Sequence, residues 1–150
     1  GYEAEVTENK GKKRGMAMKS RVMNAPKQQL LIYGFDNETT GKFKAVAERM
    51  KTELSVLPPE SAAEQVGYLA GFAGFSAKAD KSASDPRQCV IFSCMDGKKL
   101  SRTVDDMRAN GLGGIPLKAA VTSVNQKMTL SELMDELEKE HRIMHKGEDK

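Results

Sequence analysis

Four short apolar runs, with helical periodicity between them, are the feature that most constrains the fold of this chain. Each run is rich in aliphatic residues, which is typical of a strand buried in a sheet. Between the runs, apolar residues recur at the spacing of a helix that packs one face on a sheet, as Phe43, Val46 and Met50 do. Strands that alternate with helices predict an α/β protein. The runs cover residues 30–33, 54–57, 89–92 and 117–121.

The same order of elements occurs twice. A strand, a helix, a strand and a helix are predicted within 28–75 and again within 88–146, and the two segments match in order and spacing more than in residue identity. The segment between them, 76–87, has no apolar period and predicts a linker. We therefore expect two similar β-α-β-α units that form one globular domain over 28–146, with a tail at 147–150. Their four strands should form a mostly parallel sheet with helices packed on it.

Capping residues mark the expected helix starts. Asn37 is placed to cap the first helix. Segments 61–64 and 129–132 have the Ser/Thr-x-x-Glu spacing of a capping box, which predicts that a helix begins at each. Three glycines between residues 67 and 74 interrupt the helix that follows the first box, so we expect them to allow close backbone packing.

The N-terminal segment differs from the rest of the chain. Between Lys10 and Lys27 there are seven Lys and Arg residues, no acidic residue and no sustained apolar period, which predicts a flexible basic arm over 1–27. Such an arm can neutralise the phosphates of RNA or DNA without reading their sequence. It has no aromatic residue for base stacking between these two lysines. Nucleic acid is therefore not the partner that we expect, and an RNA-associated protein stays an alternative.

Composition favours a protein without a membrane anchor. The longest weakly polar run, 66–75, is far shorter than the roughly 20 residues of a membrane span. No charged start leads into an apolar signal core, so we predict no secretion signal. Cys89 and Cys94 flank one predicted strand and would have to fold it back to form a bridge. Free thiols favour a reducing compartment, and we expect a cytoplasmic location.

The loops at the carboxyl ends of the strands are where a ligand is expected. If all four strands are parallel, these loops share the edge of the sheet at which open α/β sheets bind ligands. Asp36 and Cys94 lie in two of these loops and are candidate ligand-binding residues. Asp36, Glu60 and Asp96 make this edge acidic, and no glycine-rich phosphate loop is present. We therefore expect neither a phosphate pocket nor a bound cofactor.

A cysteine and a pair of histidines are candidates for catalysis and for metal binding, but each also has a structural explanation. Cys94 precedes a predicted helix, which would lower its pKa, but no His lies near it in the sequence to act as base. His141 and His145 share one face of the last helix at a spacing that can bind a divalent metal, although the helix dipole also favours histidines there. We predict no catalytic residue and no bound metal.

Two stretches resemble a known family. They are 67–71, Gly-Tyr-Leu-Ala-Gly, and 117–125, Leu-Lys-Ala-Ala-Val-Thr-Ser-Val-Asn, with a helix after the second that reads Glu-Lys-Glu-His at 138–141. Over roughly 28–145 the chain is similar to the uncharacterised bacterial family called domain of unknown function 3783. The resemblance implies a small bacterial α/β protein and supplies no activity. Met128 stands where that family commonly has an aromatic residue, so a stacking role there is not expected.

The second stretch holds further candidate ligand-binding residues. Lys118, Thr122 and Asn125 form the Lys-Ala-x-x-Thr-x-x-Asn pattern of the family. Lys118 and Thr122 share one face of a strand near the expected ligand edge, where a small polar ligand would fit. In the alternative interpretation, Lys118 covers apolar surface with its stem while Asn125 holds the turn through its side-chain amide.

The expected function follows from these residue sets. The sequence reveals no complete acid–base pair, metal cluster or nucleophile–base arrangement. We therefore expect a non-catalytic module of the bacterial cytoplasm that binds a small polar ligand or a protein. One alternative is a small enzyme that uses Cys94, or Lys118 with Thr122 and Asn125. Another is a homodimer subunit that pairs through the glycine-rich helix or the last helix.

Overall fold

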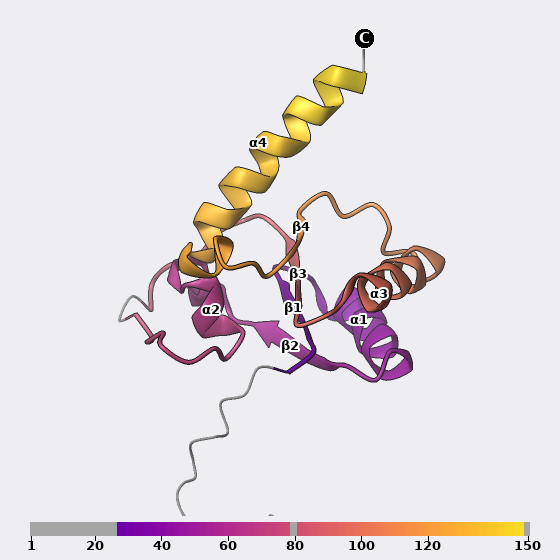
Figure 1. Cartoon of the computed structure of the whole chain (residues 1–150), viewed down its shortest axis with the longest axis horizontal. Helices are drawn as coiled ribbons and strands as arrows, with labels where there is room; N and C mark the ends of the chain where they lie inside the picture. The colour runs from indigo at the N-terminus through magenta and orange to yellow at the C-terminus, as the bar shows by residue number, and fades with distance from the viewer. Residues whose placement is uncertain (1–26, 79–80, 149–150) are drawn as a thin grey trace, which may run out of the picture.

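The four predicted strands form one sheet. The computed structural model describes residues 27–78 and 81–148, with side chains as far as Arg142. β1 (Gln29–Tyr33) and β3 (Cys89–Ser93) occupy the centre of the sheet, and β2 (Glu53–Leu57) and β4 (Lys118–Ala120) its edges, in the order β2-β1-β3-β4 (Figure 1). β1 is parallel to β2 and β3 is parallel to β4, whereas β1 and β3 are antiparallel. The predicted α/β class and the mostly parallel four-stranded sheet are confirmed.

One face of the sheet is covered by two long helices. α1 (Asn37–Arg49) and α3 (Gly97–Ala109) lie side by side on this face, at the right of Figure 1. Phe43 and Val46 of α1 and Met107 of α3 are buried against the sheet. The strand residues that pack under them are Leu30, Ile32, Val90 and Phe92.

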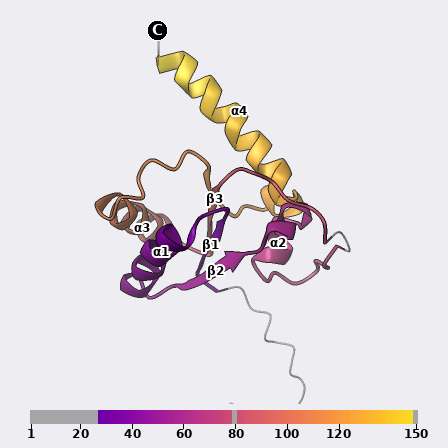
Figure 2. The ribbon, with the colours of Figure 1, turned by 180° about the vertical axis from the view of Figure 1, so that it is seen from behind.

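Shorter elements and the last helix cover the other face. They are η2 (Pro59–Ala63), α2 (Val66–Leu69) and the start of α4 (Leu130–Glu148), and η3 (Asn125–Lys127) lies against α2. The strand residues beneath them are Leu31, Tyr33, Cys89 and Ile91. Both central strands are thus buried on both faces, which is why they read as continuous apolar runs. Figures 1 and 2 show that the second half of α4 projects away from the sheet.

The expectation that all strand-to-helix loops share one edge is wrong. Because β1 and β3 are antiparallel, Gln29 pairs with Ser93 and Tyr33 pairs with Cys89. The loop after β1 and the loop after β3 therefore lie at opposite ends of the sheet. An apolar run has the same composition in either direction, so the sequence carried no information on this point.

Two of the three predicted helix caps are wrong. The N-cap of α1 is Asp36 rather than Asn37, and its Oδ1 accepts a 2.8 Å hydrogen bond from the Thr39 N–H. The capping box predicted at 61–64 is not formed, because Ser61 lies inside η2 and the Glu64 carboxylate accepts from the Lys78 N–H instead.

The third cap is confirmed at the start of α4. The Thr129 N–H donates to Glu132 Oε1 at 2.9 Å, and the Glu132 N–H donates to Thr129 Oγ1 at 3.1 Å. These reciprocal bonds satisfy two of the donors that a helix start leaves open.

The glycine-rich helix is shorter than the sequence predicts. α2 ends at Leu69, and Gly71, directly after the C-cap, has a φ of +83° that ends the helix. Gly74, with a φ of +92°, lies in the next turn. Of Gly67, Gly71 and Gly74, Gly67 packs closely against a neighbour, because an added Cβ would lie 2.5 Å from the ring of Phe75. No atom lies within 4 Å of a Cβ added at Gly71 or Gly74.

The two halves of the chain are in contact in the sheet and on both of its faces. Leu31 pairs with Ile91 at the middle of the antiparallel β1–β3 ladder. On the helical side, the Val66 N–H donates to the Met128 carbonyl at 2.8 Å and the Leu130 N–H donates to the Glu64 carbonyl at 2.9 Å. The sheet and the core therefore depend on both halves together.

Part of the expected arm and tail lies outside the described residues, namely 1–26 and 149–150. Lys27 is described, and its Nζ lies 2.8 Å from the Glu53 carboxylate at the start of β2. Among the described helices, none has the length and apolar content needed to cross a membrane.

Candidate ligand-binding cavity

A cluster of charged side chains forms where the chain enters β3. Asp85 Oδ1 accepts from the Arg87 backbone N–H at 3.0 Å and from Arg87 Nε at 2.9 Å, and Oδ2 accepts from Arg87 Nη2 at 2.7 Å. The Ser131 hydroxyl donates a fourth bond, at 2.8 Å, to Oδ2. Arg87 and the other donors hold the pKa of Asp85 far below its ordinary value.

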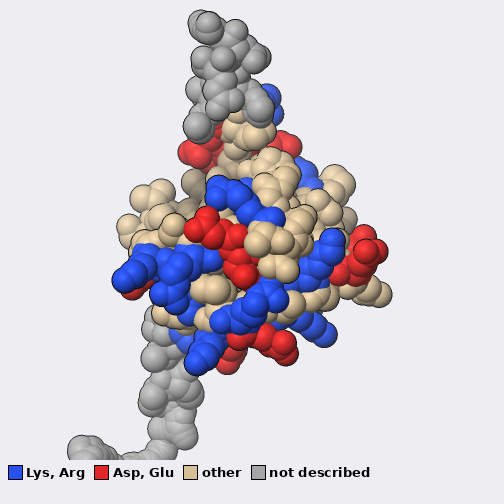
Figure 3. Space-filling view, turned by 90° about the vertical axis from the view of Figure 1, so that its right-hand side faces the viewer, with Lys and Arg blue, Asp and Glu red and all other residues tan. Residues whose placement is uncertain are grey.

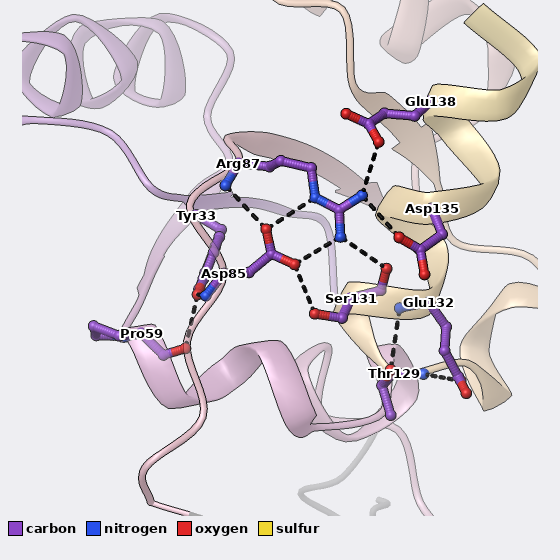
Figure 4. Close-up of polar contacts among 9 residues, drawn as sticks. All are labelled: Tyr33, Pro59, Asp85, Arg87, Thr129, Ser131, Glu132, Asp135 and Glu138. Atoms are coloured by element: carbon purple, nitrogen blue, oxygen red, sulfur yellow. Dashed lines mark hydrogen bonds and ion pairs between the residues drawn. The ribbon is translucent and has the colours of Figure 1, made fainter.

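Arg87 also anchors the last helix (Figure 4). Nη1 donates to Asp135 at 2.9 Å and to Glu138 at 3.1 Å, one turn apart on α4, and Nη2 reaches the Ser131 carbonyl at 3.4 Å. Every nitrogen of the guanidinium group therefore has a protein acceptor. Bonds of this kind between charged groups are stronger than neutral ones, so they fix where α4 leaves the sheet.

A cavity of about 400 Å³ lies beside this anchor, between α4 and the chain segments that lead into β3 and β4. Its apolar lining comes from Pro86, Pro116 and Leu117. The other residues of the wall are Gly34, Arg87, Gln88, Glu138, His141 and Arg142. A volume in this range suits a small organic ligand.

Gly34 forms part of the cavity wall, directly after β1. Its φ is +88°, and an added Cβ would lie 2.6 Å from the Arg87 carbonyl oxygen, so no other residue fits without displacing the chain. The Gln88 side-chain amide donates to the Gly34 carbonyl at 3.3 Å. These contacts tie the end of β1 to the entry of β3.

The charged residues of the cavity wall are Arg87, Glu138 and Arg142, and Glu138 is paired with Arg87. Arg142 is exposed and lines the cavity, and it forms no ion pair within the described part of the chain. Arg87, in contrast, is already held by three carboxylates. Arg142 is therefore the lining group best suited to bind an anionic group of a ligand.

A smaller hollow of about 210 Å³ lies next to it and shares Gly34. The Tyr33 hydroxyl lies in its wall, donates to the Pro59 carbonyl at 2.8 Å and accepts from the Asp85 N–H at 3.0 Å. Burial raises the pKa of Tyr33. The hydroxyl is fully used in holding the segment before β3, so this hollow offers a ligand little polar recognition.

The predicted site residues are not gathered at this cavity. Asp36 is exposed at the end of β1 and caps α1, and the Thr39 N–H lowers its pKa. Cys94 lies at the other end of the sheet, just after β3. The structure therefore separates two residues that the sequence had placed on one edge.

Cys94 occupies a turn position. Its side chain is exposed, its φ is +61°, and its Sγ accepts a 3.6 Å contact from the Ser93 hydroxyl. Gly34 has the same left-handed backbone just after β1. The first residue after each central strand thus makes the same turn. Cys89, by comparison, is buried in β3, and burial raises its pKa to about 12.

Lys118 follows the alternative interpretation, in which its stem covers apolar surface. Its Nζ donates to the Ile115 carbonyl, and its side chain lines a small hollow together with Val104, Met107 and Leu112. Burial, and secondarily Arg108, lowers its pKa.

Thr122 and Asn125 lie close together because they form hydrogen bonds with each other. The Thr122 N–H donates to Asn125 Oδ1 at 2.8 Å, and the Asn125 N–H donates to Thr122 Oγ1 at 3.0 Å. Asn125 Nδ2 donates to the Ala120 carbonyl at 2.9 Å. The amide of Asn125 therefore holds the turn after β4.

The histidine pair is described only in part. His141 lines the cavity, whereas the side chain of His145 lies outside the described residues. Within the described residues, no group of three or more His, Cys, Asp or Glu side chains is arranged to hold a metal ion.

Sequence reasoning missed the anchor because it treated 76–87 as a linker. A signal was present: Asp85 and Arg87 directly precede a buried strand, and Asp135 and Glu138 are spaced one turn apart on the last helix. Charged residues at the entrance of a buried strand need partners, and acids on a neighbouring helix face can supply them.

Comparison with known proteins supports the resemblance for the second half of the chain. Residues 88–144 match the model of the family described as Domain of unknown function (DUF3783). The match runs from the entry of β3 into α4 and does not include 28–87, which the resemblance was expected to cover. No curated protein and no solved structure matches the chain.

Proposed function

We propose that the protein is a non-catalytic module that binds a small anionic ligand in the cavity beside α4. The observation that carries this proposal is a cavity of about 400 Å³ whose position is fixed by the Asp85–Arg87 anchor. Ligand sites are usually preformed, mostly apolar hollows with a few polar groups that orient the ligand. Pro86, Pro116 and Leu117 offer the apolar surface, and Arg142 offers the cation.

The contacts of the alternative catalytic residues support a binding role. Lys118 donates to a backbone carbonyl, and Asn125 uses its amide oxygen and nitrogen inside the turn after β4. The Cys94 thiol lies in an exposed turn with the Ser93 hydroxyl as its polar neighbour. A nucleophile needs a base within hydrogen-bond reach, and these contacts supply none.

The proposal is tested by thermal unfolding with pools of small carboxylates and phosphate esters. A ligand at about a hundredfold its dissociation constant adds about 2.7 kcal/mol of stability, a rise of several degrees in the midpoint for a domain of this size. The rise should disappear in Arg142→Ala and persist in Lys139→Ala, which removes an exposed cation on the same helix that does not line the cavity. Equal loss in both variants, or no rise with any pool, would reject the site.

We also infer that 28–75 and 88–146 are two copies of one β-α-β-α unit. The same 60-residue offset relates β1 to β3 and α1 to α3, and each pair has equal length. The two N-caps, Asp36 and Asp96, keep this offset and make the same bond to the backbone three residues on.

A cytoplasmic location fits the state of the cysteines. Cys89 and Cys94 are both free and lie at either end of β3. We propose that the chain works in a reducing compartment of a bacterial cell, where both thiols persist. Purification without reductant, followed by thiol titration of the unfolded chain, should give two free thiols per chain, since Cys89 is buried in the folded protein.

A further inference from the structure

The smaller hollow next to the cavity has an apolar lining that its neighbours hold in place. Phe35, Leu57 and Pro59 supply this lining, and the hollow has a volume of about 210 Å³. The ring of Phe35 packs on the ring of the fully buried Phe43, with 4.9 Å between the ring centroids. Leu57, the last residue of β2, packs against the hydrophobic core. The hollow is therefore preformed, and it has room for several carbon atoms, because one molecule of liquid water takes about 30 Å³.

The polar groups around this hollow are engaged within the protein. The Tyr33 hydroxyl donates to the Pro59 carbonyl at 2.8 Å and accepts from the Asp85 N–H at 3.0 Å (Figure 4). The Asp85 carboxylate accepts bonds from Arg87 and Ser131, and its side chain is 7% exposed. An apolar group that enters the hollow loses contact with water and breaks none of these bonds. The hollow therefore favours an apolar group over a polar one.

Gly34 links the hollow to the cavity beside α4. It lines both spaces, and Asp85 in the wall of the hollow directly precedes Pro86 in the wall of the cavity. Gly34 is exposed and has no side chain, so no side chain separates the two spaces at this shared position. One ligand can therefore occupy both spaces if its length spans Gly34.

The charges of the cavity favour a ligand with a single negative charge. Arg87 is neutralised by three carboxylates, of which Glu138 is one, whereas Arg142 forms no ion pair within the described residues. One guanidinium matches one carboxylate in charge and in geometry. A phosphate monoester carries about 1.5 to 2 negative charges, which the single cation of Arg142 would not balance beside Glu138.

The face that carries α1 and α3 offers no comparable anion site. In its described part, Lys and Arg side chains are interspersed with Asp and Glu (Figure 3). This mixture does not form a surface of one charge that would draw an anion away from the cavity.

From these observations we propose that the ligand is a monocarboxylic acid with a short apolar tail. Its carboxylate binds Arg142, and its tail passes Gly34 and lies in the hollow lined by Phe35, Leu57 and Pro59. The inference rests on the ligand-binding function proposed above and names the class of its ligand. Affinity should rise by about two- to fourfold for each methylene group of the tail that is buried in the hollow.

The test measures the binding of butanoate, hexanoate and octanoate to the full chain by ligand-observed NMR. Octanoate should bind at least about tenfold more tightly than butanoate, because four more methylene groups leave water. Pentyl phosphate has the same tail as hexanoate and should bind more weakly, because its charge exceeds that of one cation. Arg142→Ala should weaken the binding of all three acids. Lys139→Ala, which removes an exposed cation outside the cavity on the same helix, should not.

Filling the hollow tests where the tail lies. Leu57→Phe adds bulk at the hollow, and Val56→Phe is its control, because neighbouring residues of a strand point to opposite faces and Val56 is 55% exposed. Leu57→Phe should leave the binding of butanoate unchanged and remove the gain shown by octanoate, whereas Val56→Phe should affect neither. Pro59→Phe is a second filling variant, because Pro59 is exposed and binds Tyr33 through its backbone carbonyl. Thermal unfolding establishes that each variant is folded.

The outcomes separate this inference from the function on which it rests. If neither the acids nor pentyl phosphate binds, or if all bind equally well to Arg142→Ala, the ligand-binding function fails and the inference fails with it. If the acids bind through Arg142 but octanoate gains nothing over butanoate, the function stands and the assignment of the tail is overturned. Retention of the gain in both Leu57→Phe and Pro59→Phe would also overturn it, as would tighter binding of pentyl phosphate than of hexanoate.

Discussion

Asp85 and Arg87 form an ion pair that is largely shielded from solvent. The Asp85 side chain is 7% exposed and that of Arg87 is 22% exposed, so neither charge is fully solvated. Their mutual bonds replace lost hydration, and removing one partner leaves the other charge poorly solvated. The pair therefore contributes more to stability than an ion pair at the surface does.

The change Asp85→Asn should lower the free energy of unfolding by about 2 kcal/mol at pH 7, measured in urea. Because the folded pKa of Asp85 is depressed, its contribution is complete above the unfolded pKa of about 4 and declines as the pH falls towards the folded value. The difference between the two proteins should therefore narrow below about pH 4.

A matched control is Asp105→Asn, which breaks an ion pair whose side chains are 67% and 69% exposed. Its cost should stay below about 0.5 kcal/mol. A similar loss in both variants, or a pH-independent loss in Asp85→Asn, would contradict the role assigned to this pair.

At the scale of the elements, Gly67 allows α2 to pack closely against the ring of Phe75. An Ala at position 67 would place its Cβ 2.5 Å from the Phe75 ring, which must then move. Gly67→Ala should cost about 1 to 2 kcal/mol. In a Phe75→Ala background the clash is absent, and the same change should become neutral or slightly stabilising, since Ala favours a helix over Gly by about 0.5 to 1 kcal/mol.

A double-mutant cycle with chemical denaturation measures this coupling. If Gly67→Ala has the same cost with and without the Phe75 ring, the packing of this helix does not depend on the contact. Gly41→Ala on α1 serves as the control, because a Cβ added at Gly41 would have no neighbouring atom within 4 Å.

Some elements could be predicted from the sequence and others could not. The four strands, α1, α3 and the capping box of α4 follow from apolar spacing and capping residues, which are local signals. The short α2 and the N-cap at Asp36 depend on local competition between neighbouring residues. The direction of β3 relative to β1 depends on residues far apart in the chain, and local spacing carried no signal for it. The Arg87 anchor also joins distant residues, so the local charges before β3 and on α4 indicated a need for partners without showing which residues pair.

For the whole molecule, the two halves should fold as one cooperative unit. β1 and β3 pair along their full length, and the ladder lies at the centre of the sheet. Urea unfolding of the full chain should therefore show a single transition. A fragment of residues 85–150 should show no cooperative transition by circular dichroism, because it lacks the strand that pairs with β3. A monomeric fragment that unfolds as sharply as the full chain would show that the halves are independent.

The antiparallel centre of the sheet has an evolutionary consequence. A polypeptide that held the 88–144 family segment alone would carry half of this sheet, with the β1-facing edge of its β3 unpaired. Two such polypeptides can complete four strands by pairing β3 with β3 around a twofold rotation axis. Under the proposed duplication, a single-segment relative is expected to be an obligate homodimer whose four strands correspond to the order β2-β1-β3-β4 of this chain.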